Sequence, residues 1–243
     1  MKAIYRLTAV AAGLALALAV CATEPGLVAH YNFDEGEGST LRDVSGQGNH
    51  GEIHGARYVR RGRGFCLEFD GVSNFVDCGS RPPLDLRGAL TLEAWVFPAS
   101  RVKGEPGILG KHFNSYLLSY YADGQCWWYI SGGGNAAKSL LTPGSWHHVV
   151  GTFDGQVLRL YLDGKLANAS PSKFPAIKPG KNFFIGCVLG DDGATDPNYG
   201  RSSFFPGQID ELKVYSRALS AAEVKTCFDA GVKDLALAAA YQP

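Results

Sequence analysis

Two apolar runs that meet at an Asp-Gly pair constrain this chain more than any other feature. The runs lie within Gly144–Ala167 and meet at Asp154-Gly155. Asp-Gly between β-rich runs favours a tight hairpin, because a type I′ turn needs positive φ at both central residues. A two-residue loop would place Gly151 opposite Leu158 across the hairpin. The stretch therefore predicts a central β-hairpin around which the rest of the chain is organised.

The two faces of this hairpin differ in character, since side chains alternate along a strand. One face is mostly aliphatic and belongs in a core. The other face mixes aromatic, aliphatic, polar and basic side chains: Trp146, His148, Val150, Thr152, Val157, Arg159 and Tyr161. We expect His148, Arg159 and Tyr161 to share this face and to contact a ligand. His147 and His148 diverge as strand neighbours, so packed histidines are favoured over a metal-binding pair.

Composition favours a single all-β domain. The chain has 243 residues, of which 46% are hydrophobic, 31 are Gly and one is Met. Frequent Gly with abundant Tyr, Phe and Val is typical of many short strands joined by turns. Neither an interior linker nor a repeat of fixed period is evident. We therefore expect one domain over residues 23–231, with a dozen or more strands in two packed sheets.

One helix is expected near the C-terminus. Ser220 is a natural N-cap, and Glu223 three residues later completes a capping box. Gly231 then predicts that the helix ends at about Ala230. Residues 232–243 are expected to form a tail, either as a further helical turn or as looser chain.

Residues 1–22 have the pattern of a secretion signal. Two basic residues precede an apolar run, Leu7–Val20, which is too short for a comfortable membrane span. Small residues favour cleavage after Ala22 and release of a soluble product, secreted or held in the periplasm or at the cell surface. The alternative is a lipoprotein that carries its lipid anchor on Cys21.

The charge balance gives no sign of an anionic partner. Lys plus Arg and Asp plus Glu both number 23, and neither a Lys/Arg block nor an RNA-binding motif is present. A basic patch is the usual mark of a protein that binds nucleic acid or an anionic membrane surface. We therefore expect no nucleic acid partner and no transmembrane span.

Export would permit disulfides, and five Cys residues follow the leader. An odd number leaves at least one thiol unpaired within the chain. Cys66 and Cys78 flank the turn at Gly71–Asn74, and a hairpin there would bring them near each other. A Cys66–Cys78 disulfide is therefore predicted, with buried free thiols as the alternative.

Four groups of segments carry a familiar pattern in a fixed order. They are His30–Gly36 with Asp43–Gly51, Leu67–Gly71 with Asn74–Val76, Trp146–Val149 with Phe153–Gly155 and Leu160–Lys165, and Phe205–Tyr215 with Ala218–Ser220 and Glu223. Together they resemble the laminin-G-like jelly-roll domains of the concanavalin A-like lectin/glucanase superfamily, over about residues 27–228. The resemblance implies an antiparallel sandwich of one convex and one concave sheet. It says little about function, because this fold hosts lectins, enzymes and adhesion modules.

The same resemblance implies a structural calcium ion on the rim, where the first loop meets the last strand. Ca²⁺ takes six to eight oxygen ligands. Asp43, Asn49 and Asp210 are the expected side-chain ligands, and Gly48 would add a backbone oxygen. The alternative is a solvated acidic turn in which Asp43 acts as a cap.

Aromatic residues that could stack on a sugar gather in neighbouring predicted strands. Trp127 and Trp128 are adjacent, so one is expected in the core and the other at the surface or in the groove. Trp128 is the candidate for ligand contact. The long loop at 191–199 adds acids, an amide and an aromatic, from which Asn198 and Tyr199 are further candidates.

The sequence carries no recognisable catalytic signature. Retaining glycosidases need two carboxyl groups about 5 Å apart, and glucanases of the resembling fold place them at alternate positions of one strand. No Glu-x-Asp-x-Glu occurs, and the single Glu-x-Asp, at 68–70, runs straight into a turn glycine. No catalytic residue is therefore assigned.

These observations favour a secreted, non-catalytic, lectin-like domain that binds carbohydrate and is stabilised by calcium. Its expected partner is a polysaccharide, a glycoconjugate or a cell-surface protein. The first alternative is a glycoside hydrolase or polysaccharide lyase of the same fold. The second is a structural adhesion module without a sugar site. The missing pair of acids favours binding over cleavage.

Overall fold

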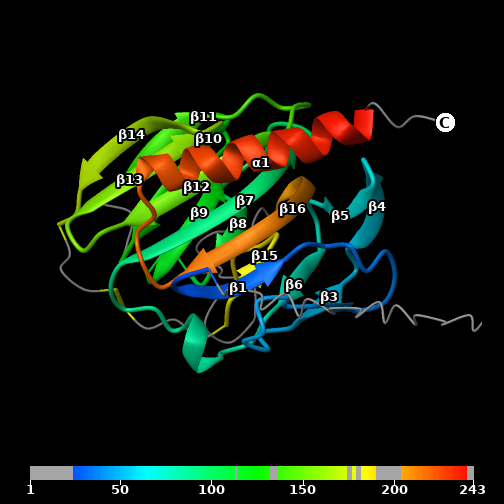
Figure 1. Ribbon diagram of the computed structural model, residues 1–243, viewed down its shortest axis with the longest axis horizontal. Helices are drawn as coiled ribbons and strands as arrows, with labels where there is room; N and C mark the ends of the chain where they lie inside the picture. The colour runs from blue at the N-terminus through cyan, green and yellow to red at the C-terminus, as the bar shows by residue number, and fades with distance from the viewer. Residues whose placement is uncertain are drawn as a thin grey trace, which may run out of the picture.

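The computed structural model describes residues 24–112, 114–131, 136–173, 177–178, 182–189 and 204–239. Within these ranges the chain forms two antiparallel eight-stranded sheets, and helix α1 (Ala221–Ala239) lies across the outer face of one of them (Figure 1). The predicted all-β jelly-roll sandwich with a C-terminal helix is confirmed. Within the described ranges, no helix is long and apolar enough to cross a membrane. The leader and Cys21 lie outside these ranges.

The strand order within each sheet mixes distant parts of the chain. Sheet A has the order β14 (Lys165–Pro171), β13 (Val157–Leu162), β12 (His147–Phe153), β7 (Leu90–Pro98), β16 (Pro206–Tyr215), β5 (Gly64–Asp70) and β4 (Arg57–Arg61), and β1 (Leu27–Tyr31) also pairs with β16. Sheet B has the order β11 (Ala136–Leu140), β10 (Gln125–Ile130), β9 (Tyr116–Tyr120), β8 (Gly107–Gly110), β15 (Phe184–Ile185), β6 (Phe75–Asp77), β3 (Gly51–His54) and β2 (Thr40–Leu41). A 3-10 turn, η1 (Pro82–Leu84), precedes β7.

The main core lies between the inner faces of the two sheets. Trp128 of β10 is fully buried there, and its Nε1 donates a hydrogen bond to the Thr152 carbonyl of β12 at 2.9 Å. A Cβ at Gly151 would lie 2.6 Å from the Trp128 ring. Glycine in the middle of β12 therefore makes room for the largest side chain of the opposite sheet.

The central hairpin forms between β12 and β13, but its register differs from the predicted one. Gly151 faces Leu160 rather than Leu158, because the turn holds two residues more than the predicted loop. The Asp154 carboxylate accepts hydrogen bonds from two backbone amides further along this turn, at 2.9 and 2.8 Å. Since side-chain direction has a period of two, a shift of two keeps every residue on its predicted face.

Helix α1 begins as predicted and ends later than predicted. Ser220 and Glu223 form the capping box, in which the Ser220 amide donates to the Glu223 carboxylate at 2.7 Å. The helix then continues through Gly231 to Ala239. A Cβ at Gly231 would lie 2.5 Å from Trp95 Nε1, so this glycine allows the helix to approach sheet A closely. The predicted end just before it is wrong.

The predicted disulfide between Cys66 and Cys78 is also wrong, because both thiols are free and buried. Cys66 lies on β5, which pairs with β4 and β16 in sheet A. Cys78 follows β6, which pairs with β3 and β15 in sheet B. The turn between them crosses from one sheet to the other instead of closing a hairpin. Burial raises the pKa of both thiols to about 12, which keeps them protonated and unreactive.

Candidate functional site

Helix α1 covers the mixed face of the central hairpin. His148 is fully buried, and its Nε2 lies 3.0 Å from Glu93 Oε1 on β7. Phe228 of α1 packs on the His148 ring, with the ring centroids 5.9 Å apart. Tyr161 is also buried, in a small apolar cluster between sheet and helix: Val150, Tyr161, Tyr215, Leu219 and Val224. The His148 and Tyr161 side chains therefore hold α1 on the sheet instead of facing solvent.

Arg159 lies on the same face of β13 as Tyr161 but nearer the turn, where it pairs with Asp154. Its Nη1 donates to Asp154 Oδ2 at 2.5 Å, and about a third of its side chain is exposed. Burial acts to raise the pKa of Asp154, but hydrogen bonds from Arg159 and the turn amides outweigh it and lower the pKa. The structure does not bring the three predicted ligand residues of this face together as one open surface.

Three of the predicted calcium ligands, Asp43, Gly48 and Asn49, lie together beside β1. The Asp43 carboxylate accepts hydrogen bonds from the backbone amides of His30, Ser45 and Asn49, at 3.0, 2.9 and 2.8 Å. Burial acts to raise the pKa of Asp43, but these hydrogen bonds outweigh it and lower the pKa. Asn49 Oδ1 is buried and has no hydrogen-bond partner among the described residues. Gly48, just before it, adopts a positive φ of 74°.

Asp210, the remaining predicted calcium ligand, lies in a different place. It forms an ion pair with Arg61 of β4, whose guanidinium also lies over the rings of Trp95 and Trp146. Burial raises the pKa of Asp210 to about 7, although Arg61 opposes this shift. In the described ranges, no contact joins Asp210 to Asp43, and no group of three His, Cys, Asp or Glu residues is arranged to hold a metal.

The two adjacent tryptophans face opposite ways, as expected, but the one that faces outward is Trp127. Trp128 has no exposed surface, so the candidate for ligand contact on this strand moves by one residue. Trp127 is half-buried on the outer face of sheet B, opposite Ser119 on β9 and Lys138 on β11. This places the indole among side chains from three neighbouring strands.

We call the group around this indole the aromatic platform. Its members are aromatic or can form hydrogen bonds: Glu105, Ser119, Tyr121, Trp127, Tyr129 and Lys138. The Tyr121 ring stacks on Trp127 with a centroid distance of 4.0 Å and an angle of 20° between the planes. Lys138 Nζ lies 3.3 Å from the centroid of the Trp127 ring, which is a cation–π contact.

Buried polar groups form the floor of the aromatic platform. Ser119 Oγ donates to Glu105 Oε1 at 3.0 Å and lies 3.4 Å from the Tyr129 hydroxyl. Burial raises the pKa of Glu105, with hydrogen bonds from Tyr121 and Ser119 opposing the shift. The raised pKa means that the neutral acid form, which can donate as well as accept a hydrogen bond, persists to higher pH than in a solvent-exposed Glu.

Sequence reasoning missed most of this group. Strand alternation could have identified Ser119 as outward from its apolar neighbour Leu118, and Trp127 as outward because it shares a face with the polar Gln125. Lys138 and Glu105 join the group only through strand pairing and a loop, which leave no local signal. The predicted ligand residues Asn198 and Tyr199 lie outside the described residues.

Comparison with known proteins identifies the family. A family model described as the concanavalin A-like lectin/glucanases superfamily matches residues 70–225, which is more than half of the chain. The chain belongs to this superfamily. No curated protein sequence matches it.

Solved structures with the same fold include domains of larger proteins. Trypanosoma rangeli sialidase in complex with 2,3-difluorosialic acid matches with a TM-score of 0.64 and 22% identity, over 86% of this chain and 33% of that chain. The binding domain of Paraclostridial Mosquitocidal Protein 1 matches with a TM-score of 0.66 and 16% identity, over 85% of this chain and 52% of that chain. A third match is domain 4 of AbnA, a GH43 extracellular arabinanase from Geobacillus stearothermophilus, solved in complex with arabinotriose. Its TM-score is 0.62 at 20% identity, over 84% of this chain and 98% of that chain.

The sequence identities to these three structures are 22%, 16% and 20%, which is enough to show a shared fold but not a shared function. The chain spans about a third of the length of the sialidase and about half of the length of the mosquitocidal fragment. It corresponds to nearly the whole of the AbnA domain. The fold of this superfamily therefore occurs both as part of larger proteins and as a separable domain.

Proposed function

We propose that this domain binds a saccharide on the aromatic platform and does not cleave it. The observation that carries the proposal is the Trp127 indole, half-buried beside Tyr121 and above a floor of hydrogen-bonding groups. Its Nε1–H is buried and has no acceptor among the described residues. An unsatisfied buried donor costs roughly 1–3 kcal/mol, so a small shift of the ring that exposes this N–H to an acceptor would be favourable.

The aromatic platform offers partners both for the apolar C–H face of a sugar and for its hydroxyl groups. The C–H face of a pyranose or furanose can pack against an aromatic ring, and its hydroxyls need partners that both donate and accept. Tyr121 and Trp127 supply the rings, while Glu105, Tyr129 and Lys138 supply the polar partners. Lys138 covers part of the Trp127 ring, and its flexible side chain can swing away and bond to a ligand hydroxyl instead.

The number of carboxyl groups on this surface favours binding over hydrolysis. Among the described residues of the aromatic platform, Glu105 supplies the single carboxyl group, whereas hydrolysis of a glycosidic bond generally uses a pair. The same fold in AbnA domain 4 was solved with arabinotriose, which is consistent with a sugar-binding domain. Measuring reducing ends and unsaturated products on a polysaccharide panel would detect cleavage, and we expect none.

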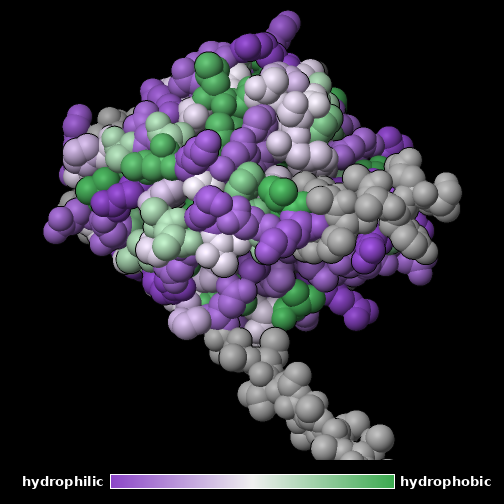
Figure 2. Space-filling model, turned by 45° about the horizontal axis from the view of Figure 1, so that its top comes forward, coloured by the Kyte–Doolittle hydropathy of each residue, from purple (hydrophilic) through white to green (hydrophobic). Residues whose placement is uncertain are grey.

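The adhesion alternative, in which the domain contacts other proteins, has less support from the visible surface. Figure 2 shows hydrophobic residues in small groups separated by hydrophilic ones on the face turned toward the reader. Among the described residues the exposed large hydrophobic side chains are scattered: Val44, Val72, Leu140, Leu166 and Val232. Protein-docking surfaces are usually marked by larger contiguous apolar patches.

Glycan-array binding with purified variants tests the proposed site. Trp127→Ala should abolish binding to the glycan that the wild-type domain retains, while Trp127→Phe should keep part of it, because a ring remains but the indole N–H is lost. Leu140→Ala is the matched control, since Leu140 is exposed on β11 close to Lys138 but outside the platform. Unchanged binding by Trp127→Ala would refute this site.

We further propose that a calcium ion is held by Asn49, Asp43 and the Gly48 carbonyl, without Asp210. The buried and unpartnered Asn49 Oδ1 fits a hard cation that prefers oxygen ligands. Such an ion would tie the first loop to β1. Calorimetric unfolding with added calcium and with chelator tests this, and we expect a higher midpoint with the ion in the wild-type domain than in Asn49→Ala. Equal midpoints with and without chelator would argue against a tightly bound ion.

A further inference from the structure

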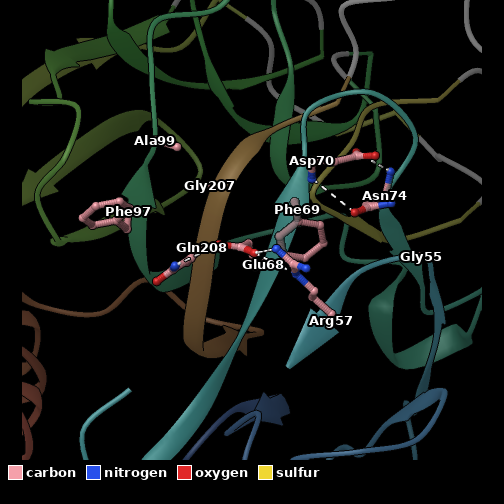
Figure 3. Close-up of a pocket in the computed structure, with 10 residues that line it drawn as sticks. All are labelled: Gly55, Arg57, Glu68, Phe69, Asp70, Asn74, Phe97, Ala99, Gly207 and Gln208. Atoms are coloured by element: carbon pink, nitrogen blue, oxygen red, sulfur yellow. Dashed lines mark hydrogen bonds and ion pairs between the residues drawn. The ribbon is translucent and has the colours of Figure 1, made fainter. Parts of the chain in front are cut away.

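A cleft of about 480 Å³ opens on the outer face of sheet A (Figure 3). The aromatic platform, by contrast, lies on the outer face of sheet B. The volume of the cleft falls within the range of about 300–1,000 Å³ that is typical of small-molecule sites. None of the predicted ligand residues lines it. Its walls come from β4, β5, β16 and β7, together with the turn that carries Asn74.

Four side chains of this cleft form one row across four adjacent strands. Arg57 faces Glu68 across β4 and β5, Glu68 faces Gln208 across β5 and β16, and Gln208 faces Phe97 across β16 and β7. Figure 3 shows Phe97 on one side of β16, with Glu68 and Arg57 on the other. The sheet register thus sets a line of hydrogen-bonding groups that ends at an aromatic ring.

The polar part of the row is already arranged for hydrogen bonding. Arg57 Nε and Nη2 donate to one oxygen of Glu68 at 2.9 and 2.7 Å, and Gln208 Nε2 donates to the other at 3.3 Å. The Arg57 guanidinium holds the pKa of Glu68 below its usual value, so this carboxylate stays charged. Because the two charges compensate each other, the row suits an uncharged ligand better than an anion.

Two glycines shape the cleft. A Cβ at Gly55 would lie 2.5 Å from Asn74 Nδ2, and one at Gly207 would collide with the Phe97 carbonyl. Phe97 is half-buried, and its ring packs at 5.7 Å from Trp146. The Asp70 carboxylate at the wall accepts hydrogen bonds from three backbone amides of its own turn, which fix its position there.

We infer that this cleft is a second saccharide site, for a neutral sugar. The sugar hydroxyls bind the row formed by Arg57, Glu68 and Gln208, and a C–H face packs on Phe97. The inference stands on the geometry of sheet A and does not require the aromatic platform to bind. With both sites filled from opposite sheets, one domain would hold two segments of polysaccharide at once.

Fluorine NMR of the full chain labelled with 5-fluorotryptophan separates the two sites in one titration. The chain has four Trp residues. Trp146 reports on the cleft through Phe97, Trp127 reports on the aromatic platform, and the buried Trp95 and Trp128 serve as internal references. The probes are arabinotriose, xylotriose, cellotriose and maltotriose, with sialyllactose as the anionic comparison.

We expect at least one neutral trisaccharide to shift the Trp146 resonance, and sialyllactose to leave it in place. Gln208→Ala should weaken the binding seen at Trp146 by about tenfold, as expected for losing one or two hydrogen bonds, and should leave the binding seen at Trp127 unchanged. Phe97→Leu, which keeps an apolar side chain of similar bulk, provides a second variant. Gln156→Ala, in the central hairpin turn, is the matched control.

The outcomes distinguish the two sites. A shift at Trp127 without one at Trp146 overturns the cleft and leaves the platform standing. A shift at Trp146 that is lost in Gln208→Ala and Phe97→Leu supports the cleft even if Trp127 never responds. A Trp146 shift that both variants retain, or one caused by sialyllactose alone, overturns the inference. No shift at either residue with any probe overturns both sites.

Discussion

The outer faces of the two sheets carry similar residues, but helix α1 covers part of one face, whereas Trp127 on the other stays half-exposed. Sheet A presents Trp95, His148, Tyr161 and Tyr215 outward, and α1 packs over all of them. Sheet B also presents aromatic and polar side chains outward, yet Trp127 stays half-exposed. The difference shows that a mixed face of aromatic, His and Arg residues does not by itself mark a working surface. In this molecule such a face is also what a helix needs in order to dock.

The neighbouring tryptophans give the largest contrast between inward and outward positions. Trp128→Ala should destabilise the domain by about 4–5 kcal/mol, because it removes a fully buried ring and its hydrogen bond to Thr152. Trp127→Ala should cost much less, about 1 kcal/mol, because that ring is half-exposed. Urea denaturation of both variants measures the difference. Similar losses would mean that the outer face of sheet B is as tightly packed as the core.

The pair formed by Glu93 and His148 tests how α1 is held on sheet A. Glu93→Ala should cost about 3 kcal/mol, because it leaves the buried His148 ring without the partner that it has at 3.0 Å. Glu93→Gln keeps an oxygen acceptor and should recover part of this loss. Amide hydrogen exchange in α1 should quicken in Glu93→Ala more than in the strands of sheet B. Uniform quickening would mean that the pair stabilises the whole sandwich instead.

Gly231→Ala reverses the usual effect of such a change in a helix. Alanine normally stabilises a helix by about 1 kcal/mol relative to glycine. Here the new Cβ would lie 2.5 Å from Trp95 Nε1, so we expect destabilisation of about 1–3 kcal/mol as α1 is pushed off the sheet. Thr226→Ala, at an exposed position of the same helix, is the control and should be neutral or slightly stabilising. A stabilised Gly231→Ala would contradict the close docking of α1.

The smallest effect expected is a change in the pH dependence of stability. Burial raises the pKa of Glu105 above 4.5, so its contribution is full below pH 4.5 and is lost as the pH rises through the raised pKa. In α1, hydrogen bonds from Arg217 and Ser220 lower the pKa of Glu223 to about 2, so its contribution is lost as the pH falls below 4.5. Glu105→Gln and Glu223→Gln should therefore change the slope of stability against pH in opposite directions. Thermal unfolding from pH 3 to 8 measures both slopes.

Much of the architecture could be predicted, because its signals are local. The Asp154 turn, the alternation around Trp127 and Trp128, and the capping box at Ser220 each depend on residues a few positions apart. Even the two-residue error in the hairpin register left every side chain on its predicted face. The Asp70 turn misled for the same reason, because turn chemistry specifies that the chain reverses but not which strand it pairs with afterwards.

The candidate sites were harder to predict because they depend on which strands pair and in what register. Lys138 meets Trp127 across two neighbouring strands, and Gln208 meets Glu68 although these two residues lie 140 positions apart. Asp210 forms an ion pair with Arg61 instead of joining Asp43 and Asn49, and nothing near Asp210 in the sequence indicates this ion pair.

By itself, the sequence determined that this protein is a two-sheet β sandwich with a C-terminal helix, and which residues share a face of each strand. Hydrophobic alternation and turn chemistry specify these features, since both act over a few residues. Only the tertiary structure decided which faces stay open. That choice depends on where α1 docks and on which strands pair, and both are set by packing between residues of different elements, such as Trp95 on β7 and Phe228 on α1. The mixed face of the central hairpin suggested a binding surface, but helix α1 packs on it instead.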